Sequence, residues 1–241
     1  MHVGKESRFL QRLFCWGVCE VDRGIRGRKI CSVNELASIC NSMPASPLFG
    51  GALSATLPPG RWLDASDVRP VPDHQEVWLE CDVDDASSII VEVLERAECT
   101  DEGAAAFHFE DLATSNAAES FAVVKAAVVP VTTLMPSLRD AGSCSILHGV
   151  QVLPAAAAAV GGTGAGDATP GDSGCGESVG STELDVHLAV VRLEAHATDL
   201  LISVCRPRRG PNGMLQAQDA EVLLSTLRSL EIHDTGLFAV L

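Results

Sequence analysis

The stretch SPLFGGALSATLPPGRWLDASDVRPVPDHQEVWLECDVDDASSIIVEVLERAECTDEGAAAFHFED, residues 46–111, decides the fold of this chain. Short apolar runs in it are separated by proline and glycine, which is the pattern of strands joined by turns. The Gly50-Gly51 pair allows a sharp bend at the start of the first strand. We expect three strands in this stretch, at 48–57, 76–80 and 88–94. The third is apolar on both faces, which predicts an interior strand.

The remainder of the chain adds further strands and two helices. Runs of β-branched residues predict strands at 120–129, 144–153, 186–193 and 198–205. A helix is expected at 101–112, and a second at 219–230 with Val222, Leu223, Leu227 and Leu230 on one stripe and Asp219 near its positive end. Because most strands follow one another without an intervening helix, we predict an α/β fold with a mostly antiparallel sheet.

Several motifs resemble the Ran guanine nucleotide release factor family. They are a PLFGGA opening, a D-x-R-x-VPD-x-QEV centre, an S-x-IVE-x-LE strand and an HFED element, with a TDLLI segment and a final Leu237-Phe238 near the other end. The resemblance covers 44–111 and 184–238. It implies a curved, mostly antiparallel central sheet flanked by helices, an α/β/α sandwich of the PsbP-like kind. It also implies binding to the small GTPase Ran.

Composition divides the chain into regions. Residues 1–43 are rich in arginine and show no amphipathic period, so we expect an extension there that is disordered or not translated. Residues 44–241 are expected to form one domain of the release-factor kind. Within it, the stretch at about 154–182 is dominated by glycine and small residues, which leaves little to bury. We therefore predict an inserted loop between two strands.

Charge restricts the classes of partner. The chain has 17 Lys and Arg against 32 Asp and Glu, a net charge of −15. Nucleic-acid binding relies on clustered cations, so no nucleic-acid partner is expected. An acidic surface instead favours a basic protein partner. The sequence has no run of about 18 apolar residues, so we expect no membrane-spanning helix. The nine cysteines include no C-x2-C pair, and we expect reduced thiols.

Four possible chemical sites are weak. The Gly171-Asp-Ser-Gly174 sequence copies a serine-protease signature, but Ser173 has no matching histidine segment and lies in low-complexity sequence. The glycine-rich stretch lacks the lysine of a phosphate loop. Three aspartates at 82–85 lack the glycine and glutamate of a calcium loop. His108 is expected to be structural rather than a ligand with Glu110 or Asp111. We expect no metal and no cofactor.

One pair of carboxylates is better placed. Asp73 and Glu76 flank a turn fixed by Pro70 and Pro72, so both can project from a rigid edge. Spacing alone favours another interpretation, in which Asp73 caps its own turn through the amide of Gln75 and Glu76 is a solvated strand opener. The family resemblance implies the opposite, because acidic residues at these two matching positions contribute to the Ran-binding surface.

Three neighbours complete the expected partner-binding surface. Arg69, Val71 and Trp78 are expected to shape the contact around the two carboxylates. Just before them, a short helical turn is expected at 64–68, capped by Asp64 or Ser66 and stopped by Pro70.

These observations predict a regulator rather than an enzyme. We expect a monomer that binds Ran, with or without a second Ran-binding protein, and promotes release of its guanine nucleotide in nucleocytoplasmic transport. The expected location is the nucleus and cytoplasm. The alternatives are a non-catalytic scaffold or binding module of the PsbP-like fold and, third, a serine hydrolase using Ser173.

Overall fold

Every strand pairing in the described part of the chain is antiparallel. The structure is a computed structural model, and it describes residues 45–57, 62–81, 86–135, 137–138, 142–154, 181–208 and 213–239. The expected extension at 1–43 and nearly all of the expected inserted loop at 154–182 lie outside these residues.

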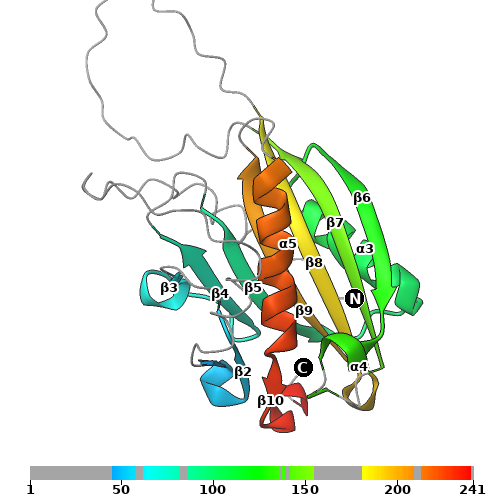
Figure 1. Ribbon diagram of the computed structural model, residues 1–241. Helices are drawn as coiled ribbons and strands as arrows, with labels where there is room; N and C mark the ends of the chain where they lie inside the picture. The colour runs from blue at the N-terminus through cyan, green and yellow to red at the C-terminus, as the bar shows by residue number, and fades with distance from the viewer. Residues whose placement is uncertain are drawn as a thin grey trace, which may run out of the picture.

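The strands form two sheets (Figure 1). The large sheet has seven strands in the order β3-β4-β5-β9-β8-β7-β6, and the small sheet has the order β1-β2-β10. The strands of the large sheet are β3 Trp62–Asp64, β4 Gln75–Glu80, β5 Ser88–Glu95, β6 Ser120–Val129, β7 Ser143–Leu153, β8 Thr182–Leu193 and β9 Thr198–Arg208. Six of these contain a predicted strand, and only the three-residue β3 was not predicted. The interior position expected of β5 is confirmed, because it pairs with both β4 and β9.

Two long helices cover opposite faces of the large sheet. Helix α3, Asp101–Ser115, packs on β6, β7 and β8, whereas helix α5, Gly213–Arg228, packs on β8 and β9. Figure 1 shows α5 in front of the sheet and α3 behind it. Alternate residues of β8 serve the two faces: Leu188 belongs to the cluster under α3, and Ala189 to the cluster under α5. The expected sheet flanked by helices is therefore confirmed.

Helix α3 begins where its sequence predicts. Thr100 caps it by accepting a hydrogen bond from the Gly103 amide at 3.3 Å. The ring of Phe109 is fully buried and lies so close to Gly149 of β7 that a Cβ there would come within 2.3 Å of it. His108 is also buried, and its Nε2 lies 2.8 Å from a carboxylate oxygen of Asp199. The structural role expected of this histidine is confirmed.

Helix α5 begins six residues earlier than the expected 219–230. Met, Leu, Gln and Ala occupy 214–217, and these residues have high helix propensity, so the helix extends back past Asp219. The expected place of Asp219 near the helix start is wrong: its buried carboxylate instead pairs with Arg206 of β9, with an Nε to Oδ2 distance of 2.9 Å. Leu223 and Leu227 are buried, as their spacing predicts.

The expected single strand at 48–57 is a hairpin. Strand β1 is Ser46–Leu48, β2 is Leu53–Ala55, and the 3-10 turn η2, Phe49–Gly51, joins them. All three turn residues have positive φ, with values of 49°, 64° and 95°. Two glycines in succession adopt this conformation readily, and the chain therefore reverses where extended structure was predicted.

Later residues complete the small sheet. Strand β10, Glu231–Ile232, pairs with β2, and the 3-10 turn η6, Thr235–Ala239, follows. The amides of His233 and Asp234 both donate to the carbonyl of Ala52, at 2.8 and 3.1 Å. The two segments that carry the family resemblance thus lie side by side. Three further short elements are η3 Ala65–Asp67, α4 Val131–Leu134 and η5 Glu194–His196.

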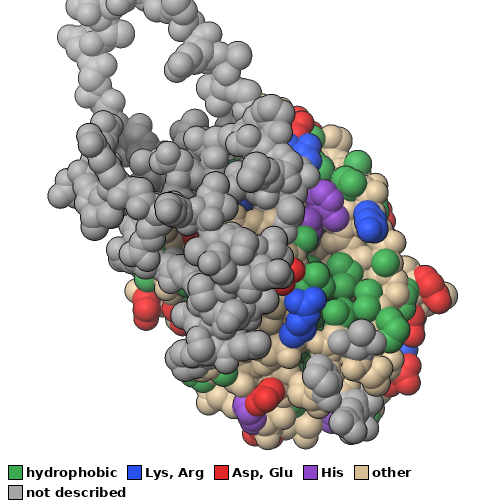
Figure 2. Space-filling view, viewed as in Figure 1, with side chains coloured by type: hydrophobic (Ala, Val, Ile, Leu, Met, Phe, Trp, Pro, Cys, Tyr) green, Lys and Arg blue, Asp and Glu red, His purple; other side chains and the backbone are tan. Residues whose placement is uncertain are grey.

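The outermost strand β6 is exposed along nearly its whole length. It places Phe121, Val123, Val124 and Val128 at 44–58% exposure. Figure 2 shows hydrophobic side chains on the face that carries α5, beyond the helix and over β6 and β7. Strand β6 therefore widens the sheet but adds little to the core.

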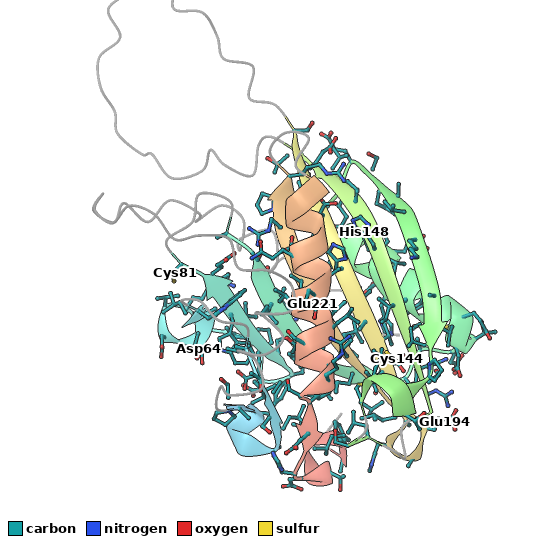
Figure 3. All side chains as sticks on the ribbon, in the orientation of Figure 1. Asp64, Cys81, Cys144, His148, Glu194 and Glu221 are labelled. Carbon is teal, nitrogen blue, oxygen red and sulfur yellow. The ribbon has the colours of Figure 1, made fainter. Side chains whose placement is uncertain are left out.

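Two histidines stack across neighbouring strands. His148 of β7 and His187 of β8 are directly paired, with ring centroids 4.3 Å apart and planes 6° from parallel. His148 Nε2 lies 3.0 Å from an oxygen of Asp185. Figure 3 labels His148 beside the upper half of α5. His187 is only 6% exposed, which makes its protonation unfavourable.

Candidate functional site

A groove of about 410 Å³ lies where strand β4 begins. It draws on four parts of the chain: the hairpin turn η2, the end of β3 with η3, the turn that enters β4, and η6. Figure 3 labels one of its residues, Asp64, beside β3 and β4. The lining residues are Phe49, Asp64, Ser66, Val71, Pro72, Asp73, Gln75, Glu76, Val77 and Leu237.

The turn before β4 presents Asp73 to solvent. The Gln75 amide donates to the carbonyl of Pro72 at 2.9 Å, and the Val93 amide donates to the carbonyl of His74 at the same distance. These two hydrogen bonds therefore fix the backbone of the turn and connect it to β5. The Gln75 amide is not available to Asp73, so the interpretation of Asp73 as a cap of its own turn is wrong. Its exposed carboxylate borders the groove instead.

Glu76 reaches the same groove from the strand itself. It lies opposite Val91, a core residue, and its side chain is half-buried. The backbone N–H of Phe49 donates a 2.5 Å hydrogen bond to Glu76 Oε1. Burial raises the pKa of Glu76, the Phe49 N–H opposes that shift, and the charge of Asp64 adds to it. Glu76 is therefore not the solvated strand opener of the alternative interpretation.

Asp64 is the third carboxylate in the groove. It has the capping role that the sequence predicts, because its Oδ1 accepts a 2.8 Å hydrogen bond from the Ser66 amide at the start of η3. In the β3-β4 pairing it lies opposite Trp78, two residues along the strand from Glu76. The lining of the groove thus contains three carboxylates, those of Asp64, Asp73 and Glu76.

The three expected neighbours of the carboxylates are placed differently from one another. Val71 lines the groove. Arg69 is half-buried outside the groove lining, and burial lowers its pKa. Trp78 is 6% exposed and belongs to the core under α5, so the expectation that it shapes a surface contact is corrected. Side chains alternate along β4, so Trp78 lies on the same face of the strand as Glu76, two residues further toward the core.

The groove suits a cationic side chain with an apolar stem. Its three carboxylates provide negative charge, and no Lys or Arg is among the described residues that line it. Phe49, Val71, Pro72 and Leu237 add apolar side chains to the lining. Lysine and arginine have this combination of a hydrocarbon stem and a charged end. A partially apolar setting also strengthens charge pairing relative to open water.

The other chemical candidates receive no structural support. Ser173 and the aspartates at 82–85 lie outside the described residues. Within the described ranges, no three His, Cys, Asp or Glu side chains come together as a metal site. The cysteines that the structure describes are free thiols, and no helix there is long and apolar enough to cross a membrane.

Sequence reasoning did not assign most of the groove residues to the site, among them Phe49, Asp64 and Leu237. Phe49 and Leu237 both belong to segments quoted for the resemblance, but nothing in their spacing brings them next to β4. Asp64 was predicted only as a cap. The signal that could have found Phe49 is the glycine pair after it, since a tight turn there aims a backbone N–H away from the hairpin ladder.

A family model and several relatives match the chain. The model described as "Ran-interacting Mog1 protein" matches residues 46–207. The "Ran guanine nucleotide release factor" of Bos taurus is 34% identical over 204 residues, covering 80% of this chain and 95% of the relative. The "Nuclear import protein mog1" of Schizosaccharomyces pombe is 47% identical over 70 residues, covering 29% of this chain and 36% of the relative.

A solved structure has the same fold. The Saccharomyces cerevisiae Ran-binding protein Mog1p superimposes with a TM-score of 0.57 at 23% identity, covering 82% of this chain and all of that one. The antiparallel sheet flanked by helices is therefore shared with a known structure.

Proposed function

Because the chain belongs to the Ran-interacting Mog1 protein family, we propose that it binds the small GTPase Ran through the acidic groove and promotes release of Ran's guanine nucleotide. The observation that carries the proposal is that Asp64, Asp73 and Glu76 line one groove together with several apolar side chains. The segments that build this groove are those on which the family resemblance rests. The chain acts as a regulator and makes no covalent bond.

The mechanism follows from charge competition. Asp73 and Glu76 engage basic groups near the nucleotide of Ran and weaken their hold on phosphate. Val71 contacts the partner, Arg69 borders the contact, and Trp78 supports β4 from the core. Linkage makes the effect reciprocal, so bound nucleotide weakens the affinity of Ran for this chain by the same factor.

The magnitude of the effect indicates that the carboxylates do not act alone. An acceleration of about 10^5-fold in nucleotide release requires about 7 kcal/mol of selective stabilisation of the open state. Truncating one partner of a buried interfacial charge pair typically costs about 2 to 5 kcal/mol. The apolar walls of the groove, or a second Ran-binding protein, supply the remainder.

The cellular role follows from the same proposal. Two yeast relatives are named nuclear import proteins. We place this chain in nucleocytoplasmic transport, in the nucleus and cytoplasm, acting as a monomer. The PsbP-like description of its sandwich is part of this proposal.

The experiment is the release of a fluorescent guanine nucleotide from purified Ran with and without this chain. Wild-type chain accelerates release, and the double variant Asp73→Lys, Glu76→Lys abolishes both Ran binding and acceleration. A matched control changes the charge by the same amount at two exposed carboxylates of another surface, Glu110→Lys with Glu119→Lys. The control retains full activity.

Three outcomes separate the possibilities. Equal loss in both double variants would show a general charge effect and refute the groove assignment. Ran binding without faster release would leave the scaffold role. Unchanged binding in the groove variant, measured by calorimetry, would remove the carboxylates from the site.

A further inference from the structure

The Phe49–Gly51 turn holds a hydrogen bond that its own hairpin does not need. In the hairpin ladder Leu48 is paired with Leu53, and the turn closes through the Ala52 amide, which donates to the Phe49 carbonyl at 3.2 Å. The Phe49 N–H takes no part in that closure. It points across to β4 and donates to Glu76 Oε1, 27 residues away in the chain.

The backbone of the turn is unusual for the residue it carries. Phe49 has a φ of +49°, a region that bulky side chains rarely adopt. Two buried leucines, Leu48 and Leu53, anchor the turn on either side at 1% and 0% exposure. A strained backbone conformation persists where the surrounding structure holds it in place, and such positions cluster at functional sites.

Glu76 needs such a partner because of the face it occupies. Alternation along β4 puts it on the side that carries Trp78 and faces the core under α5. A carboxylate at the margin of an apolar layer adopts several rotamers unless a donor fixes it. The charge of Asp64 from β3 repels it, and Asp73 from the preceding turn lines the same groove.

We propose that the Phe49–Gly51 turn is a positioning device for Glu76, whose Oε1 it holds through the Phe49 N–H so that Oε2 is presented to the basic group of the partner. The inference rests on the proposed function of the groove. Oε2 has no hydrogen-bond partner among the residues that the structure describes. The turn thus fixes the Glu76 side chain before the partner binds. This preorganisation reduces the conformational entropy that binding would otherwise cost.

The test uses glycine substitutions that act on the backbone alone. An alanine methyl at Gly51 would meet no atom within 4 Å, but the φ of +95° is unfavourable for alanine. Gly51→Ala therefore disturbs the turn without a clash. A hydrogen bond to a charged group is worth about a tenfold change in an equilibrium constant, so we expect Ran affinity to fall about tenfold. Gly103→Ala in α3, where the methyl makes an ordinary 3.4 Å contact, is the matched control and leaves affinity unchanged.

A double-mutant cycle distinguishes positioning from a structural role. If the turn acts through Glu76, Gly51→Ala adds no loss of affinity, within about twofold, in a Glu76→Gln background. In an Asp73→Asn background its effect remains about tenfold. A structural role would give the same loss in all backgrounds, which would overturn the proposal.

The pH profile gives a second readout. The charged form of Glu76 binds the partner, so affinity falls as pH drops through its pKa. Loss of the Phe49 N–H raises that pKa further, and in Gly51→Ala the fall begins at a higher pH. An identical pH profile for wild type and Gly51→Ala would contradict the inference.

Folding and function remain separable in this design. Thermal unfolding of each variant shows whether it is folded. If Gly51→Ala does not fold, Gly50→Ala replaces it, because alanine tolerates the φ of +64° at this position better. If Glu76→Gln does not weaken Ran binding, the proposed function of the groove fails. If Glu76→Gln weakens binding but Gly51→Ala causes its full further loss of affinity in the Glu76→Gln background, only the positioning inference fails.

Discussion

Replacing Gly149 with alanine should destabilise the domain by forcing α3 away from the sheet. The new methyl would lie 2.3, 2.7 and 2.8 Å from three ring atoms of Phe109, whereas carbon atoms pack at about 3.5 to 4.0 Å. Phe109 is fully buried, so its ring has no solvent to move into. Overpacking of this kind costs about 1 to 3 kcal/mol. Because three ring atoms are affected, we expect a loss near the upper end of that range.

Urea unfolding followed by circular dichroism measures this loss. With a slope of about 3 kcal/mol per molar for a domain of this size, the midpoint should fall by roughly 1 M. Gly142→Ala is a demanding control, because its methyl would come within 2.9 Å of Glu194. The Glu194 side chain is 58% exposed and can move, so this variant should lose little stability.

A second substitution tests the cause. Phe109→Leu removes ring atoms that the methyl of Gly149→Ala would meet, so the double variant should lose less stability than the sum of the two single variants. Equal losses in Gly149→Ala and Gly142→Ala would refute the reasoning, as would simple additivity with Phe109→Leu.

Two further predictions concern buried charge. Burial lowers the pKa of His187 to about 4, with Asp185 opposing the shift, so the stability that this histidine contributes is present above pH 6.5 and is lost as pH falls toward 4. Between pH 7.5 and pH 5 the loss of stability caused by His187 amounts to about 2 kcal/mol. The variant His187→Leu should therefore lose about 2 kcal/mol less than the wild type between these two pH values, measured by urea unfolding. An equal loss in the two proteins would contradict this prediction. Asp219→Asn removes one of the two carboxylates that pair with the buried Arg206 and leaves the one of Glu80, so it should cost about 1 to 3 kcal/mol in the same assay, whereas Glu221→Gln, which breaks an exposed ion pair of the same helix, should cost about 0.5 kcal/mol or less. Equal losses in these two variants would refute the argument.

Most of the large sheet could be predicted because its strands have clear period and boundaries. The runs at 88–94 and 198–205 are apolar, and both are central strands. The helix at 101–112 was found from its apolar residues, and its threonine cap at Thr100 accounts for where it begins. These features are local, so sequence patterns detect them.

The hairpin at β1 and β2 could not be predicted in the same way. Its apolar alternation on both sides of Gly50 matches one continuous strand, and only the positive φ values of three successive residues reverse the chain. The pairing of β10 with β2 joins residues far apart in the chain and has no local signal at all.

The site shows the same limit. Asp73, Glu76 and Val71 were predicted and do line the groove. Trp78 was expected on the same surface, but it lies two residues after Glu76 in the core, where burying its ring stabilises the fold more than exposing it would. Phe49 and Leu237 reach the groove only through tertiary packing.

The dependence of the groove on Leu237 also governs when a newly made chain can act. All other lining residues have been synthesised once Val77 is complete, and 237 − 77 = 160 further residues separate it from Leu237. At about 5 to 20 residues per second, this interval lasts roughly 8 to 32 s. During that time a chain still on the ribosome lacks one wall of the groove and the strand that pins the hairpin beside it. On the proposed function of the groove, chains interrupted before this segment therefore have an incomplete partner-binding surface.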